Sequence, residues 1–282
     1  GINRVSLGLQ SAQNRELQML GRIHSYEEFL TTYQMIRQSG MDQINIDVMA
    51  AIPEQTLESY QDTLEKIVSL NPEHISSYSL IIEPGTVFGD WEKNGTLKHV
   101  DEDVDRQMYE WTGKYLQHMG YQRYEISNYC RDGMECRHNC VYWSGGEYLG
   151  LGVNASSYLT GYRFHVPVSP KTYRSYVDRI CVLAEKESEG LKKAVQEMDE
   201  LEFIDQRAQM EEFMFLGLRM MAGVSEQEFY QRFGISMMEV YGDIIKKYQN
   251  MDLLCRRDTG RVALTEKGID VSNSILSDFL LN

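Results

Sequence analysis

The residue types best suited to chemistry lie together between Cys136 and Trp143, in the run Cys-Arg-His-Asn-Cys-Val-Tyr-Trp. Imidazole and thiol groups ligate borderline and soft metals, and imidazole is a common ligand of heme iron. Tyr142 and Trp143 add flat rings that suit packing against a flat cofactor. Gly150-Leu151-Gly152 follows and permits a close approach of the backbone. The run therefore predicts a ligand site; the alternative is a surface loop whose aromatic residues form local core.

His138 is the residue of this run best suited to ligate a metal ion. Four side chains offer a competing zinc site of three sulfurs and one nitrogen: Cys130, Cys136, His138 and Cys140. Their spacings are tight and irregular compared with those of paired Cys-x-x-Cys zinc knuckles, so an unligated thiol cluster is the simpler interpretation. A contribution of the thiols to the binding of a metal-containing cofactor is the remaining alternative.

Composition limits the class of protein. The chain has 282 residues, 42% hydrophobic content and five prolines, which is typical of an ordered globular protein with one large and one small domain. A net charge of −14 argues against binding to nucleic acid or to an anionic membrane. Apolar runs are too short for stable membrane insertion. The odd number of five cysteines fits a cytoplasmic location better than a disulfide framework.

Strands that alternate with helices are predicted in the first third of the chain. The strand expected at 4–10 places its aliphatic side chains on one face and Ser6, Gly8 and Gln10 on the other. Further strands are expected at 43–49, 75–82 and 124–129. Asp47 lies on the polar face of the second of these strands. The first two strands share a pattern of one apolar face and one face of small or polar residues.

Because helices separate the first strands, we expect these strands to be parallel in an α/β fold. A sheet covered on both faces would be apolar on both, so the polar face favours a partial (β/α) barrel around a cavity over a flavodoxin-like sheet. Gln10 and Asp47 would point into this cavity near the carboxyl ends of their strands. A helix is expected from Ser25, which forms a capping box with Glu28, to Gly40.

The C-terminal part predicts a small helical, winged-helix-like domain. Helices are expected at 205–221, 226–233 and 237–248, with a hairpin around Asp258-Thr259-Gly260. From residue 200 onward there are nine basic and fourteen acidic residues, which argues against binding to duplex DNA and favours a lid or partner-docking role. The predicted domains are residues 1–168 with the half barrel and the 136–143 segment, a helical connector at 169–200, and the C-terminal domain at 201–282.

Several segments resemble the later barrel strands of radical SAM proteins, namely residues 1–11, 20–22, 45–49 and 83–86. The family that the chain resembles is that of the oxygen-independent coproporphyrinogen III oxidases, above all its heme-chaperone branch (HemW). The run from His138 to Trp143 resembles the His-Asn-x-x-Tyr-Trp signature of that branch, whose histidine is taken to bind heme. Residues 211–281 are similar to the C-terminal helical domain of the family.

The resemblance implies that Gln10, Arg22 and Asp47 contact S-adenosylmethionine. The chemistry of these residues agrees with this role. A carboxylate accepts hydrogen bonds from ribose hydroxyls, an amide both donates and accepts, and a guanidinium holds a carboxylate through two parallel hydrogen bonds. The alternatives are a buried strand-end acceptor for Asp47, an interior filler for Gln10 and a surface ion pair for Arg22.

The chain departs from this family in its cysteines. The resemblance implies a 4Fe-4S cluster held by a Cys-x-x-x-Cys-x-x-Cys motif, and no such motif occurs here; Cys136 and Cys140 have the first spacing, but position 143 is Trp. We therefore expect a C-terminal part of a longer protein, without the cluster ligands and inactive by itself in radical chemistry. Its unpaired strand edges would favour self-association.

Two functions of different kinds follow from the resemblance. The first is a heme-binding chaperone that passes heme to a respiratory protein, and the His138 segment favours it. The alternative is an oxygen-independent coproporphyrinogen III oxidase, an enzyme of porphyrin biosynthesis that decarboxylates propionate side chains. A structural fragment without a ligand is the third possibility. No catalytic residue is predicted.

Overall fold

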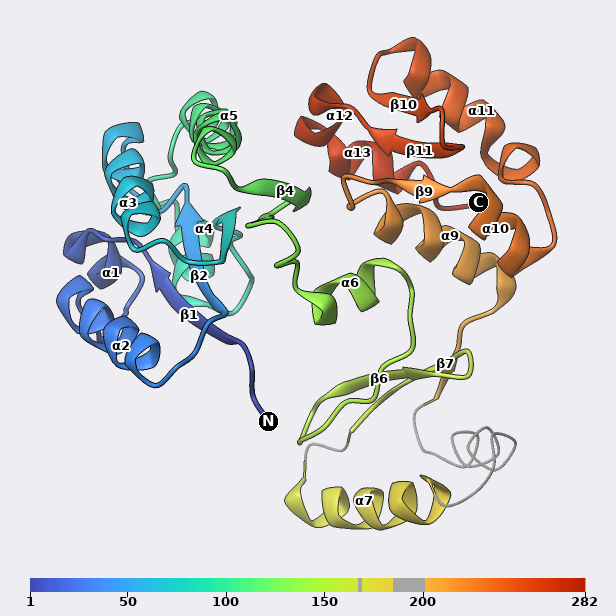
Figure 1. Cartoon of the computed structure of the whole chain (residues 1–282), viewed down its shortest axis with the longest axis horizontal. Helices are drawn as coiled ribbons and strands as arrows, with labels where there is room; N and C mark the ends of the chain where they lie inside the picture. The colour runs from blue at the N-terminus through green and yellow to red at the C-terminus, as the bar shows by residue number, and fades with distance from the viewer. Residues whose placement is uncertain (167–168, 185–200, 282) are drawn as a thin grey trace. The chain divides into compact units, whose positions relative to one another are not determined.

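The computed structural model describes residues 1–166, 169–184 and 201–281 (Figure 1). The chain divides into two compact units, Gly1–Glu135 and Cys136–Asn282, which are described separately as unit 1 and unit 2. The predicted domain boundaries after residues 168 and 200 stay predictions. The charged segment 186–200, expected to form part of the connector, lies outside the described residues.

Unit 1 contains a five-stranded sheet in the order β1-β2-β3-β5-β4. Its strands are β1 (Val5–Gln10), β2 (Ile44–Ala50), β3 (His74–Ser79), β4 (Gln122–Glu125) and β5 (Asn128–Cys130). The first three are parallel, whereas β5 pairs antiparallel with both β3 and β4. The α/β class is confirmed. The single strand expected at 124–129 is wrong, because a turn at residues 126–127 divides it into β4 and β5.

Five helices accompany this sheet: α1 (Asn14–Met19), α2 (Tyr26–Gln38), α3 (Leu57–Ser69), α4 (Val87–Lys93) and α5 (Glu102–His118). The predicted capping box at the start of α2 is confirmed. The Ser25 hydroxyl accepts from the Glu28 amide at 3.3 Å, and the Glu28 carboxylate accepts from the Ser25 amide at 2.8 Å. Gly40 follows α2 with a φ of 84°, a conformation that favours glycine.

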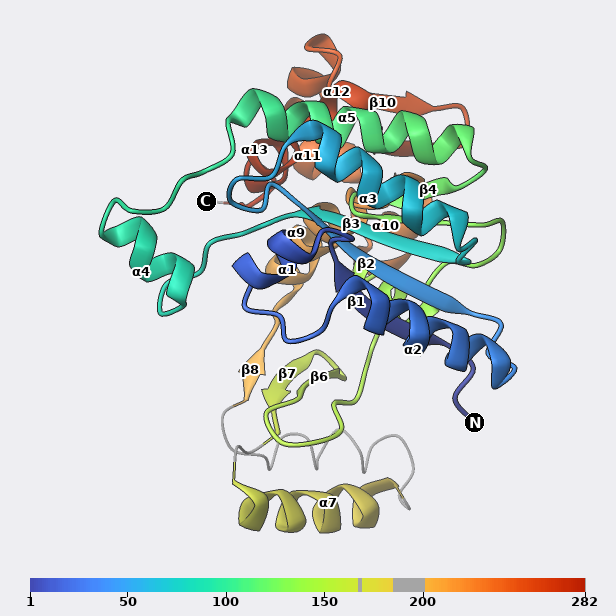
Figure 2. The ribbon, with the colours of Figure 1, turned by 90° about the vertical axis from the view of Figure 1, so that its left-hand side faces the viewer.

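The core of unit 1 lies on one face of the sheet. Aliphatic residues of β1, β2 and β3 pack there against buried side chains of α2, α3 and α5, among them Phe29, Tyr60 and Met108. Figure 2 shows these helices running along the strands. The other face carries the polar side chains that the alternation predicted, including Asn45 and Asp47, and Ser76 of β3 lies beside them. One face thus supplies stability, and the other is available to form a site.

Unit 2 begins with α6 (Arg137–Trp143), followed by the strands β6 (Ser156–Leu159) and β7 (Tyr162–His165) and by α7 (Pro170–Ala184). β7 also pairs with β8 (Glu202–Phe203). After these come α9 (Gln206–Gly217), β9 (Val224–Ser225), α10 (Glu226–Phe233), α11 (Met237–Asn250), β10 (Leu254–Arg257), β11 (Arg261–Leu264), α12 (Glu266–Asp270) and α13 (Ser272–Ser277).

The last part of unit 2 follows the predicted element order. The hairpin expected around residue 259 is confirmed by the antiparallel pairing of β10 with β11, and β9 completes a sheet in the order β10-β11-β9. Capping boxes predicted from Ser225 with Glu228 and from Ser236 with Glu239 are found complete only at Ser236, whereas Ser225 caps α10 by accepting from the Glu228 amide alone. Among the described residues, no helix is both long and apolar enough to cross a membrane.

Candidate functional site

The polar face of unit 1 brings the three residues predicted to contact S-adenosylmethionine around one side chain, Tyr78 of β3. The Tyr78 hydroxyl donates to Oε1 of Gln10 at 3.3 Å. Burial raises the pKa of the Tyr78 phenol and the charge of Asp47 raises it further, whereas the Gln10 hydrogen bond and the charge of Arg22 lower it. Tyr78 therefore contacts Gln10 and lies within electrostatic range of Asp47 and Arg22. The sequence does not mark Tyr78 because its place depends on strand register: it pairs with Met49, two residues beyond Asp47.

Gln10 ends β1 in an unusual backbone conformation. Its φ is 73°, and the pairing with β2 shifts register between Gly8 and Gln10. The side chain folds back over Gly8, so that a Cβ atom at position 8 would lie 2.9 Å from the Gln10 amide nitrogen. Such left-handed conformations are costly for residues other than glycine and cluster at functional sites. The left-handed backbone of Gln10 and the missing side chain at Gly8 thus allow the Gln10 amide to lie over the end of β1.

Asp47 is held by two neighbouring side chains. The Ser6 hydroxyl donates to its Oδ2 at 3.1 Å, and Nδ2 of Asn45 donates to its Oδ1 at 2.7 Å. Such bonds to a charged acceptor orient a carboxylate firmly. The Arg22 guanidinium, in contrast, is exposed and makes no hydrogen bond or ion pair with any residue that the structure describes. It remains available to meet an anionic group.

The α6 helix of unit 2 carries His138 on an exposed face. Nε2 of His138 lies 3.0 Å from the Tyr142 hydroxyl, one helical turn further on, and the two ring centroids are 5.0 Å apart. The Tyr142 ring contacts Tyr148 edge-on at 4.6 Å. Paired backbone hydrogen bonds of 2.9 Å join Tyr148 to Tyr158. A row of aromatic rings therefore begins at the imidazole, and Tyr148 is the member that sequence reasoning missed.

Trp143, although adjacent to Tyr142 in sequence, has a different environment. The Arg219 guanidinium lies over its ring, 4.5 Å from the centroid. Its indole N–H is buried and has no hydrogen-bond partner among the described residues. Of the two aromatic residues expected beside a heme, only Tyr142 thus contacts His138.

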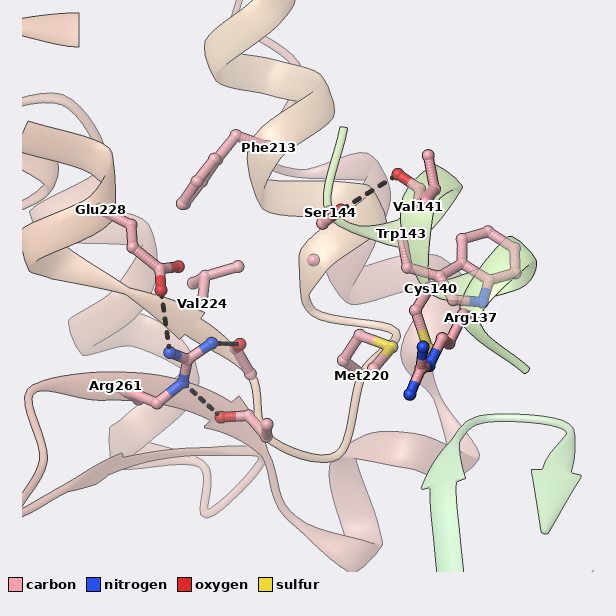
Figure 3. A pocket seen from close by; sticks show the side chains of 13 residues that line it. Arg137, Cys140, Val141, Trp143, Ser144, Phe213, Met220, Val224, Glu228 and Arg261 are labelled. Carbon is pink, nitrogen blue, oxygen red and sulfur yellow. Dashed lines mark hydrogen bonds and ion pairs between the residues drawn. The ribbon is translucent and has the colours of Figure 1, made fainter. Parts of the chain in front are cut away.

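A cavity of about 390 Å³ lies within unit 2 on another face of α6 (Figure 3). Its lining residues come from α6, α9, β9, α10, β11 and the loop before β9: Arg137, Cys140, Val141, Trp143, Ser144, Phe213, Gly217, Met220, Ala222, Gly223, Val224, Glu228 and Arg261. Arg261 braces this loop by donating to the carbonyls of Ala222 and Gly223 at 3.1 and 2.7 Å. His138 is not part of the lining.

The described residues contain no group of three or more His, Cys, Asp or Glu side chains that could hold a metal ion. Cys130 is buried, and Cys136 and Cys140 are partly buried thiols. The zinc alternative and an iron–sulfur cluster therefore find no ligand set in the part of the chain that the structure covers. A single imidazole suffices for heme, because the porphyrin supplies four of the iron ligands.

Comparisons with known proteins match different family models to unit 1 and to unit 2. The radical SAM superfamily model matches residues 1–67, and the model of the HemN C-terminal domain matches residues 204–271. The heme chaperone HemW of Lactococcus lactis is 35% identical over 281 residues, which cover 100% of this chain and 70% of the relative. The heme chaperone HemW of Bacillus subtilis is 34% identical over 99% of this chain and 70% of its own length.

A solved structure of coproporphyrinogen III oxidase (HemN) from Escherichia coli superimposes with a TM-score of 0.74 at 18% identity. The match covers 99% of this chain and 64% of that chain, which is less than two thirds of its length, and it shows a shared fold. The chain is therefore a protein of the radical SAM superfamily. Within that superfamily it belongs to the HemN-like family, together with the HemW proteins.

Proposed function

We propose that the chain serves in a heme chaperone, with heme bound at α6 and S-adenosylmethionine bound at the strand ends of unit 1. The observation that carries the proposal is the exposed His138 imidazole beside Tyr142 and Tyr148. It occurs in a chain whose relatives over 70% of their length are heme chaperones by name. The cargo would be passed to a respiratory protein.

The α6 surface suits a heme in two respects. Its imidazole is accessible to a large planar ligand, and the Tyr142 and Tyr148 rings offer apolar surface against which the macrocycle can pack. Nε2 of His138 now shares a hydrogen bond with Tyr142. Binding of iron at this nitrogen would require the hydroxyl to withdraw, so the iron and Tyr142 would compete for the same position.

The strand ends of unit 1 suit an adenosylated amino acid. Asp47 presents an oriented carboxylate to ribose hydroxyls, Gln10 presents an amide, and the exposed Arg22 guanidinium can take the amino acid carboxylate. We propose that β1, β2 and β3 are later strands of a partial radical SAM barrel around this ligand. The winged-helix-like arrangement from α9 to β11 would serve as a lid or docking module.

The oxidase alternative rests on fold alone. The HemN structure shares the fold over nearly the whole chain, but at 18% identity this similarity does not extend to the reaction. The α6 imidazole and the named relatives favour the chaperone.

Heme titration tests the proposal. Added heme should shift the Soret band of the wild-type chain, and His138→Ala should abolish the shift or weaken binding at least about tenfold, as expected for loss of an axial ligand. His118→Ala removes another exposed histidine and serves as the matched control. If binding persists in His138→Ala but is lost in the double variant Cys136→Ser, Cys140→Ser, the histidine assignment is wrong. Binding indifferent to both variants would contradict an α6 site.

A further inference from the structure

A chain of buried hydrogen bonds leads to Asp47 across the polar face of unit 1. The Tyr124 hydroxyl lies 2.9 Å from Nε2 of His74, whose Nδ1 lies 2.6 Å from Oδ1 of Asn45. Nδ2 of Asn45 lies 2.7 Å from both Oδ1 of Asp47 and Oγ of Ser6. Because Asn45 and His74 are only 4% and 1% exposed, they depend on these protein partners rather than on bulk water.

The charge of Asp47 fixes which groups donate and which accept along this series of hydrogen bonds. An ionised carboxylate only accepts hydrogen bonds, so Asn45 turns its amide nitrogen toward Asp47 and its amide oxygen toward His74. Nδ1 of His74 must then carry the proton, and Nε2 must accept from the Tyr124 hydroxyl. Ser76 donates to the same Asn45 oxygen at 3.2 Å. Every group therefore donates toward Asp47.

The protonation state of His74 agrees with this direction. Burial, together with the positive charge of Arg4, lowers the pKa of His74 to about 3. The imidazole is therefore neutral near pH 7 and keeps one nitrogen as an acceptor for Tyr124. A charged imidazole would donate from both nitrogens, although the Tyr124 hydroxyl can adapt by accepting.

We propose that Asn45 and His74 are positioning residues for Asp47, fixing its carboxylate so that the remaining lone pairs face the two hydroxyls of a ribose. The inference rests on the proposed S-adenosylmethionine site. Neither residue contacts the ligand; each acts through the next group in the chain, as supporting residues do around preorganised sites. Without His74, the Asn45 oxygen keeps only its 3.2 Å hydrogen bond from Ser76, so the Asn45 amide holds the Asp47 carboxylate less firmly.

The first test determines which nitrogen of His74 carries the proton. Proton–nitrogen correlation spectra of the nitrogen-15-labelled full chain distinguish the two neutral tautomers, which coordinates alone do not. The Nδ1–H form is expected. The Nε2–H form would place an acceptor opposite Asn45, reverse its amide and turn the amide oxygen toward Asp47. That result would overturn the positioning role whether or not a ligand binds.

The second test measures preference for the ribose hydroxyls, as the ratio of the dissociation constants of 2′,3′-dideoxyadenosine and adenosine. The wild-type chain should prefer adenosine by about tenfold, the scale of hydrogen bonds to a charged group. His74→Leu should lose most of this preference. His74→Asn should keep it, because its amide nitrogen reaches toward the former Nδ1 position and can donate to Asn45. Thermal unfolding reports stability separately, so a merely structural role would move the melting temperature and leave the ratio unchanged.

The outcomes separate this inference from the proposed function. If the wild-type chain does not prefer adenosine over 2′,3′-dideoxyadenosine, the proposed contact of Asp47 with ribose is wrong. The tautomer of His74 would still show whether Asn45 and His74 orient the Asp47 carboxylate. A preference that survives in folded His74→Leu overturns the positioning role alone. If His74→Leu does not fold, the double variant Ser76→Ala, Tyr124→Phe weakens the same chain through two other donors. An unchanged ratio in that folded variant overturns the inference equally.

Discussion

The two candidate sites of this chain are built in opposite ways. In unit 1, Asp47 is held by the buried amide of Asn45, two residues earlier on β2, and the buried Gln10 at the end of β1 is held by Tyr78 of β3. On α6 of unit 2, His138 is exposed, and among the described residues its ring has one hydrogen-bond partner, Tyr142, one helical turn away. A rigid, preorganised pocket suits a cofactor that must be held in one geometry. An accessible iron-ligating side chain on a short helix suits a cargo that must be both taken up and released.

The largest expected effect concerns acid stability and the buried polar face of unit 1. The pKa of His74 is lowered from 6.5 to about 3 by burial, so between these pH values the unfolded chain binds a proton that the folded chain does not. The stabilising contribution of His74 is therefore fully present above about pH 6.5 and is lost as the pH falls toward 3. Urea unfolding at a series of pH values should show a steeper loss for wild type than for His74→Asn, by about 1.4 kcal/mol per pH unit. Parallel curves would show that His74 is not buried neutral.

The second prediction compares stability at the two sites. Asn45→Ala should lower the free energy of unfolding by about 3 kcal/mol, because it leaves the buried donors of His74 and Ser76 without their acceptor. His138→Ala should change it by less than about 0.5 kcal/mol, since the side chain is exposed. Denaturant titrations of both variants provide the measurement. Similar losses would remove the distinction between a buried and an accessible site.

The third prediction concerns the strand end. Gly8→Ala should weaken adenosine binding about tenfold, because the new Cβ meets the Gln10 amide and displaces it from Tyr78. The matched control is Gly113→Ala on α5, where the nearest atom to an added Cβ is the Tyr129 hydroxyl at 3.9 Å. Binding measured by ligand-detected NMR should be unaffected in the control. Equal affinities for all three chains would exclude the Gln10 amide from the site.

The smallest effect is expected at Tyr142. Tyr142→Phe removes the hydroxyl that competes with iron for Nε2 of His138, and heme should bind about threefold more tightly, the scale of one neutral hydrogen bond. Heme titration followed by absorbance provides the measurement, with Tyr162→Phe on β7 as the control. Weaker binding in Tyr142→Phe would mean that the hydroxyl orients the imidazole for iron instead of competing with it.

Much of unit 1 could be predicted from sequence because its signals are local. Alternation along residues 43–49 predicted β2, and the Ser25–Glu28 pair predicted the start of α2. The strand expected at 124–129 failed because a side chain competes with the ladder. The Glu125 carboxylate accepts from the Ser127 amide at 2.9 Å and from the Asn128 side chain, which turns the backbone between β4 and β5.

The site residues that sequence reasoning missed depend on contacts between elements. Tyr78 reaches Gln10 through the register of three parallel strands, and no pattern within its own strand marks it. Tyr148 contacts Tyr142 across the Gly145-Gly146 turn, where it follows α6. Tyrosine is common both in cores and at sites, so its residue type alone distinguishes neither role. Both tyrosines are therefore identified by their contacts in the structure and not by their spacing in the sequence.

The nature of the axial ligand tests the central claim most directly. Electron paramagnetic resonance and resonance Raman spectra of the ferric heme complex distinguish a nitrogen ligand from a thiolate. We expect nitrogen ligation in the wild-type chain and its loss in His138→Ala, with spectra of the Cys136→Ser, Cys140→Ser variant unchanged from wild type. A thiolate signature in the wild-type chain, or nitrogen ligation that persists in His138→Ala, would contradict it.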